Sequence, residues 1–234
     1  MGSDLVLSAD FAPVAALLAD RGRAAMLTAL LDGRPLAAGE LARVAGVGAP
    51  TASAHLARLL DGGLVTVVKQ GRHRYYTLRG SEVAQVIEAL SRIGAPVEPR
   101  SLRQSRDARR LREARTCYDH LAGRAGVALF TALVDGGLIE ADGDDGFAVT
   151  VKGEERLSAV GLDVAALRRA RRTFAWQCLD WTERRPHLNG ALGAALTARM
   201  IDLGWFERGT TRRALVVTEV GLEGLADSFG CVLM

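Results

Sequence analysis

The stretch from Leu18 to Leu78 reads LADRGRAAMLTALLDGRPLAAGELARVAGVGAPTASAHLARLLDGGLVTVVKQGRHRYYTL. In its first two thirds, apolar residues recur at spacings of three and four, which indicates helices. The pattern predicts helical structure within residues 11–33, a short helix over 38–45 and a longer one over 51–61. Glycine and proline between these segments mark the turns, and Pro50 directly precedes the longer helix.

The last third of the stretch predicts a β-hairpin. Two runs rich in β-branched and aromatic residues, 64–68 and 75–78, flank the basic turn Lys-Gln-Gly-Arg-His-Arg. A helix, a turn, a second helix and a basic hairpin in this order are typical of a winged helix-turn-helix. Residues 82–93 then predict one more helix, with an apolar stripe at spacings of three and four.

The same stretch resembles the ArsR-type bacterial repressors. The segments that carry the resemblance are LAD near Leu18, ELA near Glu40, the run from Thr51 to Val65, and QGRHRYYTL at its end. With its flanking helices, the match covers about 95 residues. The resemblance implies a homodimer built on the first and last helices of the domain. It also implies binding to a palindromic double-stranded DNA operator, with repression relieved by a signal.

We expect the helix over 51–61 to enter the major groove of DNA, with the hairpin as a second contact. Thr51 and Ser53 suit phosphates or base edges, Arg58 suits a phosphate, and Ala54 offers apolar contact alone. His55 matches the family's His-Leu pair and borders the apolar stripe, so we interpret it as partly buried. Because few of these groups read bases, the wing should supply much of the affinity. The predicted wing contacts are Lys69, Arg72, His73 and Arg74.

Residues 94–100 have the composition of a linker, and the sixteen residues 100–115 form the most arginine-rich part of the chain. Two interpretations stay open for the arginines from Arg100 to Arg115. They form a solvated helix face, or they contact DNA phosphates or a dimer partner.

The remaining residues repeat parts of the first domain. The segment Leu-Leu-Asp-Gly-Gly-Leu-Val at 59–65 reappears in altered form at 133–139 and at 200–206. Residues 120–123 and 187–190 share the opening His-Leu-x-Gly. We therefore predict two degenerate winged-helix-like repeats, at about 117–160 and 176–226. The tip of the second hairpin carries three aspartates within residues 142–145 and should repel DNA.

A signal site is expected in this second half. Metal-sensing members of the family use a Cys-x-Cys near the first helix of the helix-turn-helix or Asp/His pairs on the last helix, and residues 41–44 and 82–93 contain neither. Two other clusters lie at equivalent places in the repeats. The candidate sensing residues are Cys117, Tyr118, His120, Trp176, Cys178, Trp181 and His187.

These candidates permit several kinds of signal. The sulfur atoms favour a thiophilic metal or metalloid, or oxidation of the thiols, and the aromatic rings suit a small organic effector. Alternatively, these residues only pack the interface between the repeats. We hypothesise that Cys117 and Cys178 lie near one another and sense the signal. No metal identity follows from the sequence.

The chain of 234 residues has 30 basic and 27 acidic side chains, so its net charge of +3 is too small to indicate a partner. Three widely spaced cysteines indicate neither a disulfide framework nor a zinc ribbon. No apolar run reaches the roughly 18–20 residues of a membrane span, and Asp4 and Asp10 do not fit a signal peptide. We expect a cytoplasmic protein without membrane contact.

The sequence therefore predicts a mainly α chain with short β-hairpins, in the α+β class. Residues 1–94 form a winged helix-turn-helix, 95–116 a basic linker helix, and 117–234 a sensing or dimerisation domain. The predicted function is a DNA-binding repressor and not an enzyme. An enzyme with a winged-helix dimerisation domain, of the small-molecule methyltransferase type, is an alternative, but no Gly-rich turn follows a strand. A nucleoid or protein-interaction module is a third reading.

Overall fold

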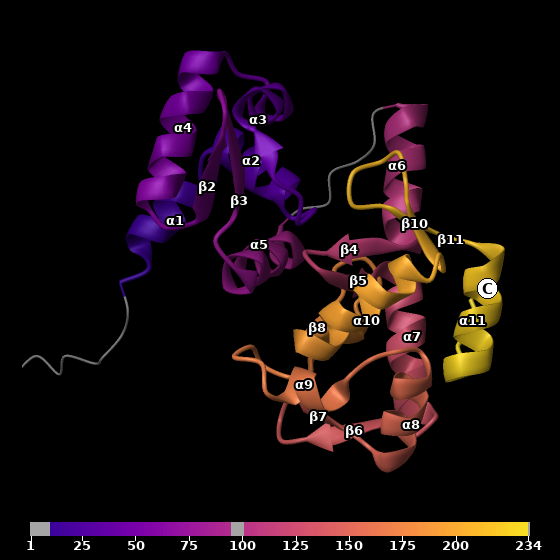
Figure 1. The fold of residues 1–234 in the computed structure, drawn as a ribbon. Helices are drawn as coiled ribbons and strands as arrows, with labels where there is room; N and C mark the ends of the chain where they lie inside the picture. Colours follow the sequence, from indigo (N-terminus) through magenta and orange to yellow (C-terminus); the bar gives the residue numbers. More distant parts are fainter. Residues whose placement is uncertain (1–9, 95–100, 234) are drawn as a thin grey trace, which may run out of the picture. The chain divides into compact units, whose positions relative to one another are not determined.

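The computed structural model describes residues 10–94 and 101–233 (Figure 1). It divides the chain into two compact units, Met1–Ile87 and Glu88–Met234. Most of the predicted linker, 95–100, lies outside the described residues, as does Arg100. The division falls within a helix, whereas the sequence predicts a domain boundary after residue 94. None of the helices in the described ranges combines the length and the apolar character that crossing a membrane requires.

The first unit is a winged helix-turn-helix. Its elements are α1 (Ala12–Leu18), α2 (Arg21–Leu30), β1 (Leu36–Ala37), α3 (Ala38–Ala45), α4 (Ala49–Asp61), β2 (Val65–Gln70), β3 (His73–Leu78) and α5 (Ser81–Ile93), the last of which runs on into the second unit. The strands form one antiparallel sheet in the order β1-β3-β2. The core lies between α2, α3 and α4, where the buried leucines include Leu27, Leu41 and Leu56.

Local sequence explains the helix boundaries of the first unit. Asp20 caps α2 by accepting a hydrogen bond from the Arg23 backbone N–H at 2.9 Å. Gly46 ends α3 with a φ of 66°, a left-handed conformation that glycine adopts without a Cβ clash. Helix α4 starts two residues before the predicted range of 51–61, and Thr51 lies in its first turn. It begins at Ala49, with Pro50 also in the first turn. Backbone N–H groups in a first turn have no acceptor within the helix, so the N–H that proline lacks is not missed there.

Two further expectations for the first unit need correction. The hairpin strands are longer than predicted and leave a two-residue turn at Gly71 and Arg72, since Gly71 takes the positive φ that such a tight turn needs. Lys69, His73 and Arg74 therefore lie in strands, not in a loop. Leu60, which the periodicity assigns to the buried stripe of α4, is 39% exposed because it lies at the edge of that stripe.

The second unit begins with α6 (Leu102–Glu113) and then shows one element order twice. The order is strand, strand, helix, strand, strand, helix. The first copy is β4 (Arg115–Cys117), β5 (His120–Ala122), α7 (Gly123–Asp135), β6 (Ile139–Asp142), β7 (Gly146–Val149) and α8 (Val151–Ala159). After α9 (Val164–Arg168), the second copy is β8 (Trp176–Leu179), β9 (Pro186–Asn189), α10 (Gly190–Asp202), β10 (Phe206–Arg208), β11 (Leu215–Val217) and α11 (Glu219–Phe229).

The two copies also repeat individual hydrogen bonds. Thr150 donates to the carbonyl of Gly137 at 2.7 Å and caps α8, and Thr218 donates to the carbonyl of Gly204 at 2.7 Å and caps α11. Each copy packs its first helix on the hairpin of the other copy, because α7 contacts β9 and α10 contacts β5. The first hairpins of the two copies are thereby held close together. The winged-helix-like origin of each copy stays a prediction.

Candidate DNA interface and metal centre

The exposed face of α4 carries the residues that the sequence predicts to contact DNA. Thr51, Ser53, Ala54 and Arg58 are all exposed, while Ala52, Leu56 and Leu59 on the opposite face are buried against the rest of the first unit. His55 lies between the two faces. Its side chain is 15% exposed, and its Nε2 lies 3.7 Å from Oδ1 of Asp20. This location fits the prediction that His55 is partly buried.

The wing presents its basic side chains to solvent on both strands. Lys69 pairs with Arg74 across the hairpin, and Arg72 stands in the turn beside His73. All four residues are exposed. A protruding hairpin with three permanent positive charges suits the phosphate backbone of DNA. The interface with DNA stays a prediction, now with a defined surface.

The arginine-rich stretch after residue 100 is not one uniform surface. The five arginines on α6 are exposed, at positions 103, 106, 109, 110 and 112. Arg115 is an exception, because it lies in β4 and is fully buried. Its guanidinium pairs with Asp180 at 2.8 Å and stacks over Trp181 with its carbon 4.8 Å from the ring centre. The expectation that Arg115 belongs to a solvated or DNA-binding face was therefore wrong.

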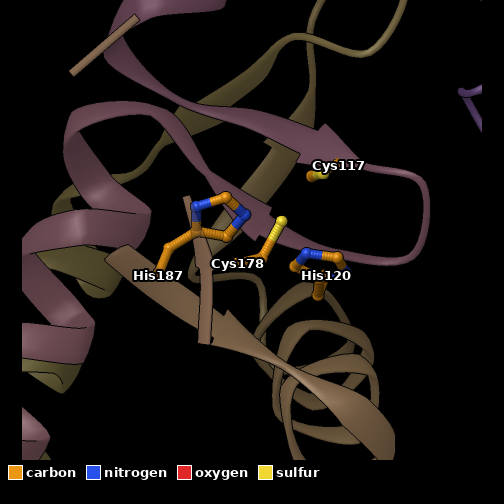
Figure 2. A group of neighbouring side chains, drawn as sticks. All are labelled: Cys117, His120, Cys178 and His187. Atoms are coloured by element: carbon orange, nitrogen blue, oxygen red, sulfur yellow. The ribbon is translucent and has the colours of Figure 1, made fainter. Parts of the chain in front are cut away.

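Four of the predicted sensing residues converge in the second unit (Figure 2). Cys117 lies on β4 directly across from His120 on β5, and Cys178 lies on β8 directly across from His187 on β9. All four side chains are buried, and one potential ligand atom from each lies within 4.8 Å of the other three. The two cysteines are therefore neighbours, 61 positions apart along the chain and one in each copy of the repeat.

Glycines allow the close approach that forms this cluster. A Cβ on Gly126 of α7 would lie 2.5 Å from the carbonyl oxygen of Leu121 and 3.6 Å from the Cβ of His187. In the second copy, a Cβ on Gly193 of α10 would lie 2.6 Å from the carbonyl oxygen of Leu188. Larger residues at either position would push the helix away from the histidines.

A carboxylate lies near the Nδ1 atom of each histidine. Nδ1 of His120 lies 3.2 Å from Oδ1 of Asp119, and Nδ1 of His187 lies 3.7 Å from Oδ2 of Asp180. Arg172 forms an ion pair with Asp119, as Arg115 does with Asp180. Each histidine thus has a neighbouring carboxylate, and an arginine holds that carboxylate in place.

These surroundings shift the pKa of each group in the cluster. Cys117 donates a hydrogen bond to Cys178, which together with burial raises the pKa of Cys117 well above its usual value. The same hydrogen bond lowers the pKa of Cys178, although burial opposes this. Burial lowers the pKa of His120, but Cys117 and Asp119 outweigh it and raise the value to about 9. Burial and the neighbouring His120 lower the pKa of His187 well below its usual value, which favours the neutral form of its ring.

The three aromatic candidates lie outside the four-residue cluster. Tyr118 occupies the turn between β4 and β5 with a φ of 62°. Trp176 is a strand residue of β8 that pairs with Asn189, and Trp181 covers Arg115.

Sequence reasoning missed the two carboxylates and their arginines. A signal was present, because Asp119 and Asp180 each stand two residues after a cysteine in a shared Cys-x-Asp spacing. The two histidines stand at different distances from their cysteines, three residues in one copy and nine in the other. Only hairpin pairing shows that both copies place the histidine opposite the cysteine.

Comparisons with known proteins agree with the first unit and extend over nearly the whole chain. A family model described as a helix-turn-helix domain matches residues 18–68. The chain is 43% identical over 215 residues to YdfF, an uncharacterised HTH-type transcriptional regulator of Bacillus subtilis (strain 168). That match covers 92% of this chain and 95% of the relative. YgaV, an HTH-type transcriptional regulator of Escherichia coli (strain K12), is 32% identical over 72 residues, which is 30% of this chain and 73% of that one.

Solved structures resemble about a third of the chain. Reduced HlyU from Vibrio cholerae is 33% identical, covers 36% of this chain and 87% of its own, and has a TM-score of 0.33. The transcriptional repressor BigR from Xylella fastidiosa is 27% identical, covers 37% of this chain and 87% of its own, and has a TM-score of 0.34.

Proposed function

Since this chain belongs to the HTH-type transcriptional regulators and carries a helix-turn-helix domain, we propose that it is a homodimeric repressor whose second unit senses the signal. In this proposal the protein leaves a palindromic operator when the signal reaches the four Cys and His residues. One observation carries the proposal. The chain that presents an exposed basic helix-turn-helix also buries four soft ligand side chains at one point of its second unit.

The DNA contact follows from the exposed face of α4 and from the wing. α4 enters the major groove, where Thr51 and Ser53 bond phosphates or base edges and Arg58 neutralises a phosphate. The wing places Lys69 and Arg72 on the backbone or in the adjacent minor groove. Repression in the cytoplasm is consistent with three free cysteines, because thiols there stay reduced.

The homodimer uses apolar side chains on the first and last helices of the DNA-binding domain. Phe11 at the start of α1 is 77% exposed and Ile93 at the end of α5 is 82% exposed, while Val86 and Leu90 of α5 are nearly half exposed. Exposed apolar side chains grouped on one helix favour burial against a partner. The sequence places Val86 and Leu90 on the apolar stripe of this helix, and a second copy of the chain would bury them.

A chain of contacts runs from the cysteines to α5. Arg213 donates to the carbonyl of Thr116, next to Cys117, and forms a buried ion pair with Glu88 on the second half of α5. Arg92 on the last turn of α5 donates to the carbonyl of Leu179, next to Cys178, at 3.4 Å. A change in the two cysteine-bearing strands therefore acts on the helix that we assign to the dimer contact.

Two measurements test the proposal. First, the full chain is used to select binding sites from random duplex DNA, and we expect a palindrome. A recovered pool without dyad symmetry, or a monomer in sedimentation at the concentrations that bind DNA, would contradict the homodimeric repressor.

Second, release from the selected DNA is measured by fluorescence anisotropy on addition of Zn²⁺ or of a thiol oxidant. We expect release from the wild type and from Cys231→Ser, since Cys231 is a buried free cysteine outside the cluster. Cys117→Ser and Cys178→Ser should stay bound. Release of both variants at wild-type signal concentrations would remove the cluster from the proposal.

A further inference from the structure

We propose that Cys117, His120, Cys178 and His187 form a closed tetrahedral site for one divalent metal ion of the zinc type. Only the role of this ion as the signal rests on the proposed function. Metal binding itself is tested without DNA. The sequence leaves thiophilic metals, metalloids, oxidants and organic effectors open as signals, and this proposal chooses a divalent metal ion.

The geometry of the four side chains suits tetrahedral coordination. Zinc binds cysteine sulfur at about 2.3 Å and histidine nitrogen at about 2.0–2.1 Å, which puts the ligand atoms of one tetrahedron roughly 3.4–3.8 Å apart. In the structure, no two of the four ligand atoms are more than 4.8 Å apart. Movements of about 1 Å or less would therefore close the site around an ion. Figure 2 shows His187 turning one ring nitrogen toward the sulfur of Cys178.

The charge of the donor set points to a divalent ion. Two thiolates and two neutral imidazoles carry a charge of minus two, which a divalent ion cancels, whereas a monovalent ion leaves one negative charge uncompensated. All four side chains are buried, and a buried net charge is costly. Two sulfur and two nitrogen donors also suit a borderline-soft ion such as Zn²⁺ better than Mg²⁺ or Ca²⁺, which prefer oxygen.

A second, independent observation comes from the histidine rings. Among the described residues, Nε2 of His120 and both ring nitrogens of His187 are buried and lack a hydrogen-bond partner. Buried polar nitrogens normally have a hydrogen-bond partner, and one without a partner destabilises the fold. A metal ion coordinated by the two Nε2 atoms satisfies one such nitrogen on each ring.

The carboxylates behind the rings complete the arrangement. Metal-binding histidines usually direct their other ring N–H at a carboxylate, which fixes the tautomer and orients the ring. Asp119 lies 3.2 Å from Nδ1 of His120, and Asp180 lies 3.7 Å from Nδ1 of His187. When the proton of each ring is on Nδ1 and faces the carboxylate, the lone pair on Nε2 is available to bind the ion. We assign Asp119 and Asp180 as positioning residues.

The position of the site between the two copies gives it a structural consequence. Each copy supplies one cysteine and one histidine from its first hairpin. Four protein ligands leave no open coordination position for water or substrate, which is typical of structural and regulatory sites and not of catalytic ones. One bound ion therefore crosslinks the two hairpins, whose neighbouring residues Thr116 and Leu179 contact Arg213 and Arg92.

Cobalt titration of the full chain tests the site. Metal-free protein is prepared with a chelator under reducing conditions and titrated with Co²⁺, whose visible absorption is intense in tetrahedral sites and whose thiolate bonds give a near-ultraviolet charge-transfer band. We expect both features to saturate at one equivalent per chain and to bleach when Zn²⁺ displaces Co²⁺. Weak octahedral bands, or no saturable binding by the folded wild type, would overturn the proposal.

Variants identify the ligands and the positioning residue. Cys117→Ser and His187→Gln should lose the tetrahedral spectrum, whereas Cys231→Ser should keep it. Asp119→Asn, at a partly exposed position, should keep the spectrum and weaken affinity about 10–100-fold, the usual effect of removing such a partner. Circular dichroism of each metal-free variant confirms folding. Loss of the spectrum in Cys231→Ser to the same degree as in Cys117→Ser would overturn the ligand assignment.

The two proposals fail in different ways. A protein that binds the selected palindrome but shows no tetrahedral Co²⁺ spectrum overturns the metal site and leaves the repressor in place. A protein that binds one Co²⁺ tetrahedrally and supports the metal site, but shows the same DNA affinity with and without Zn²⁺, overturns the role of the ion as the signal.

Discussion

Asp180 is the residue whose removal should most damage the second unit. Its Oδ2 accepts hydrogen bonds from Arg115 at 2.8 Å and from the backbone N–H of Gly123 at 2.7 Å, and its Oδ1 accepts from the backbone and hydroxyl of Thr182. Both Asp180 and Arg115 are buried, and the arginine holds the pKa of the carboxyl well below its usual value although burial opposes this. Asp180→Asn keeps the shape of the side chain but leaves Arg115 without a counter-charge.

The expected loss of stability follows from the buried arginine. Breaking a buried ion pair by neutralising one partner costs about 3–5 kcal/mol, since the other charge stays desolvated. Urea unfolding of the metal-free protein measures the loss. All three tryptophans, at positions 176, 181 and 205, lie in the second unit, so their fluorescence reports on that unit alone. With an m-value of about 2 kcal/mol/M, a loss of about 4 kcal/mol lowers the midpoint by roughly 2 M.

A matched control and a double variant complete this experiment. Asp144→Asn removes a carboxylate from an exposed hairpin tip and should change stability by no more than about 0.5 kcal/mol. Adding Arg115→Met to Asp180→Asn should recover part of the loss, because the isolated charge is then gone. A loss below about 1 kcal/mol in Asp180→Asn, with an unchanged m-value, would refute the expectation that the buried pair of Arg115 and Asp180 stabilises the second unit.

Three other perturbations test separate parts of the molecule. Arg72→Ala should weaken operator binding and lower the slope of log affinity against log salt by about 1 per protomer, as measured by anisotropy; an unchanged slope would mean that the wing tip does not contact phosphate. Gly126→Ala should destabilise the second unit by about 1–3 kcal/mol in urea unfolding, because its Cβ would lie 2.5 Å from a carbonyl oxygen. The control Gly39→Ala in α3, whose Cβ would have nothing within 4 Å, should be neutral or stabilising by up to about 1 kcal/mol. Glu88→Gln should leave the affinity for Co²⁺ unchanged but raise the Zn²⁺ concentration needed to release DNA, since it removes the charge that pairs with Arg213; wild-type release would exclude this contact from the signalling route.

Local sequence determined the first unit almost completely. Periodic apolar residues, glycines and Pro50 place α3, α4 and the wing within about two residues of their observed bounds, because short-range packing and turn chemistry decide them. Exposure along α4 follows from the same periodicity, which is why Thr51, Ser53 and Arg58 were assignable to the outer face. The resemblance to ArsR-type repressors rests on these local features and agrees with the relatives found.

The sequence also indicated that Cys117 and Cys178 occupy equivalent places in two copies of a repeat. It did not determine that they meet, that each faces a histidine across a hairpin, or that Asp119 and Asp180 support those histidines. These relations depend on packing between segments about sixty residues apart. Helix α7 of the first copy packs on β9 of the second, and α10 of the second copy packs on β5 of the first. Arg115 shows the same limit. Its charge and neighbours suggested a solvated helix, and only the tertiary fold, which places Asp180 2.8 Å away, makes its burial possible. Short-range chemistry thus decided the helix-turn-helix unit, and long-range packing decided that the four Cys and His side chains converge.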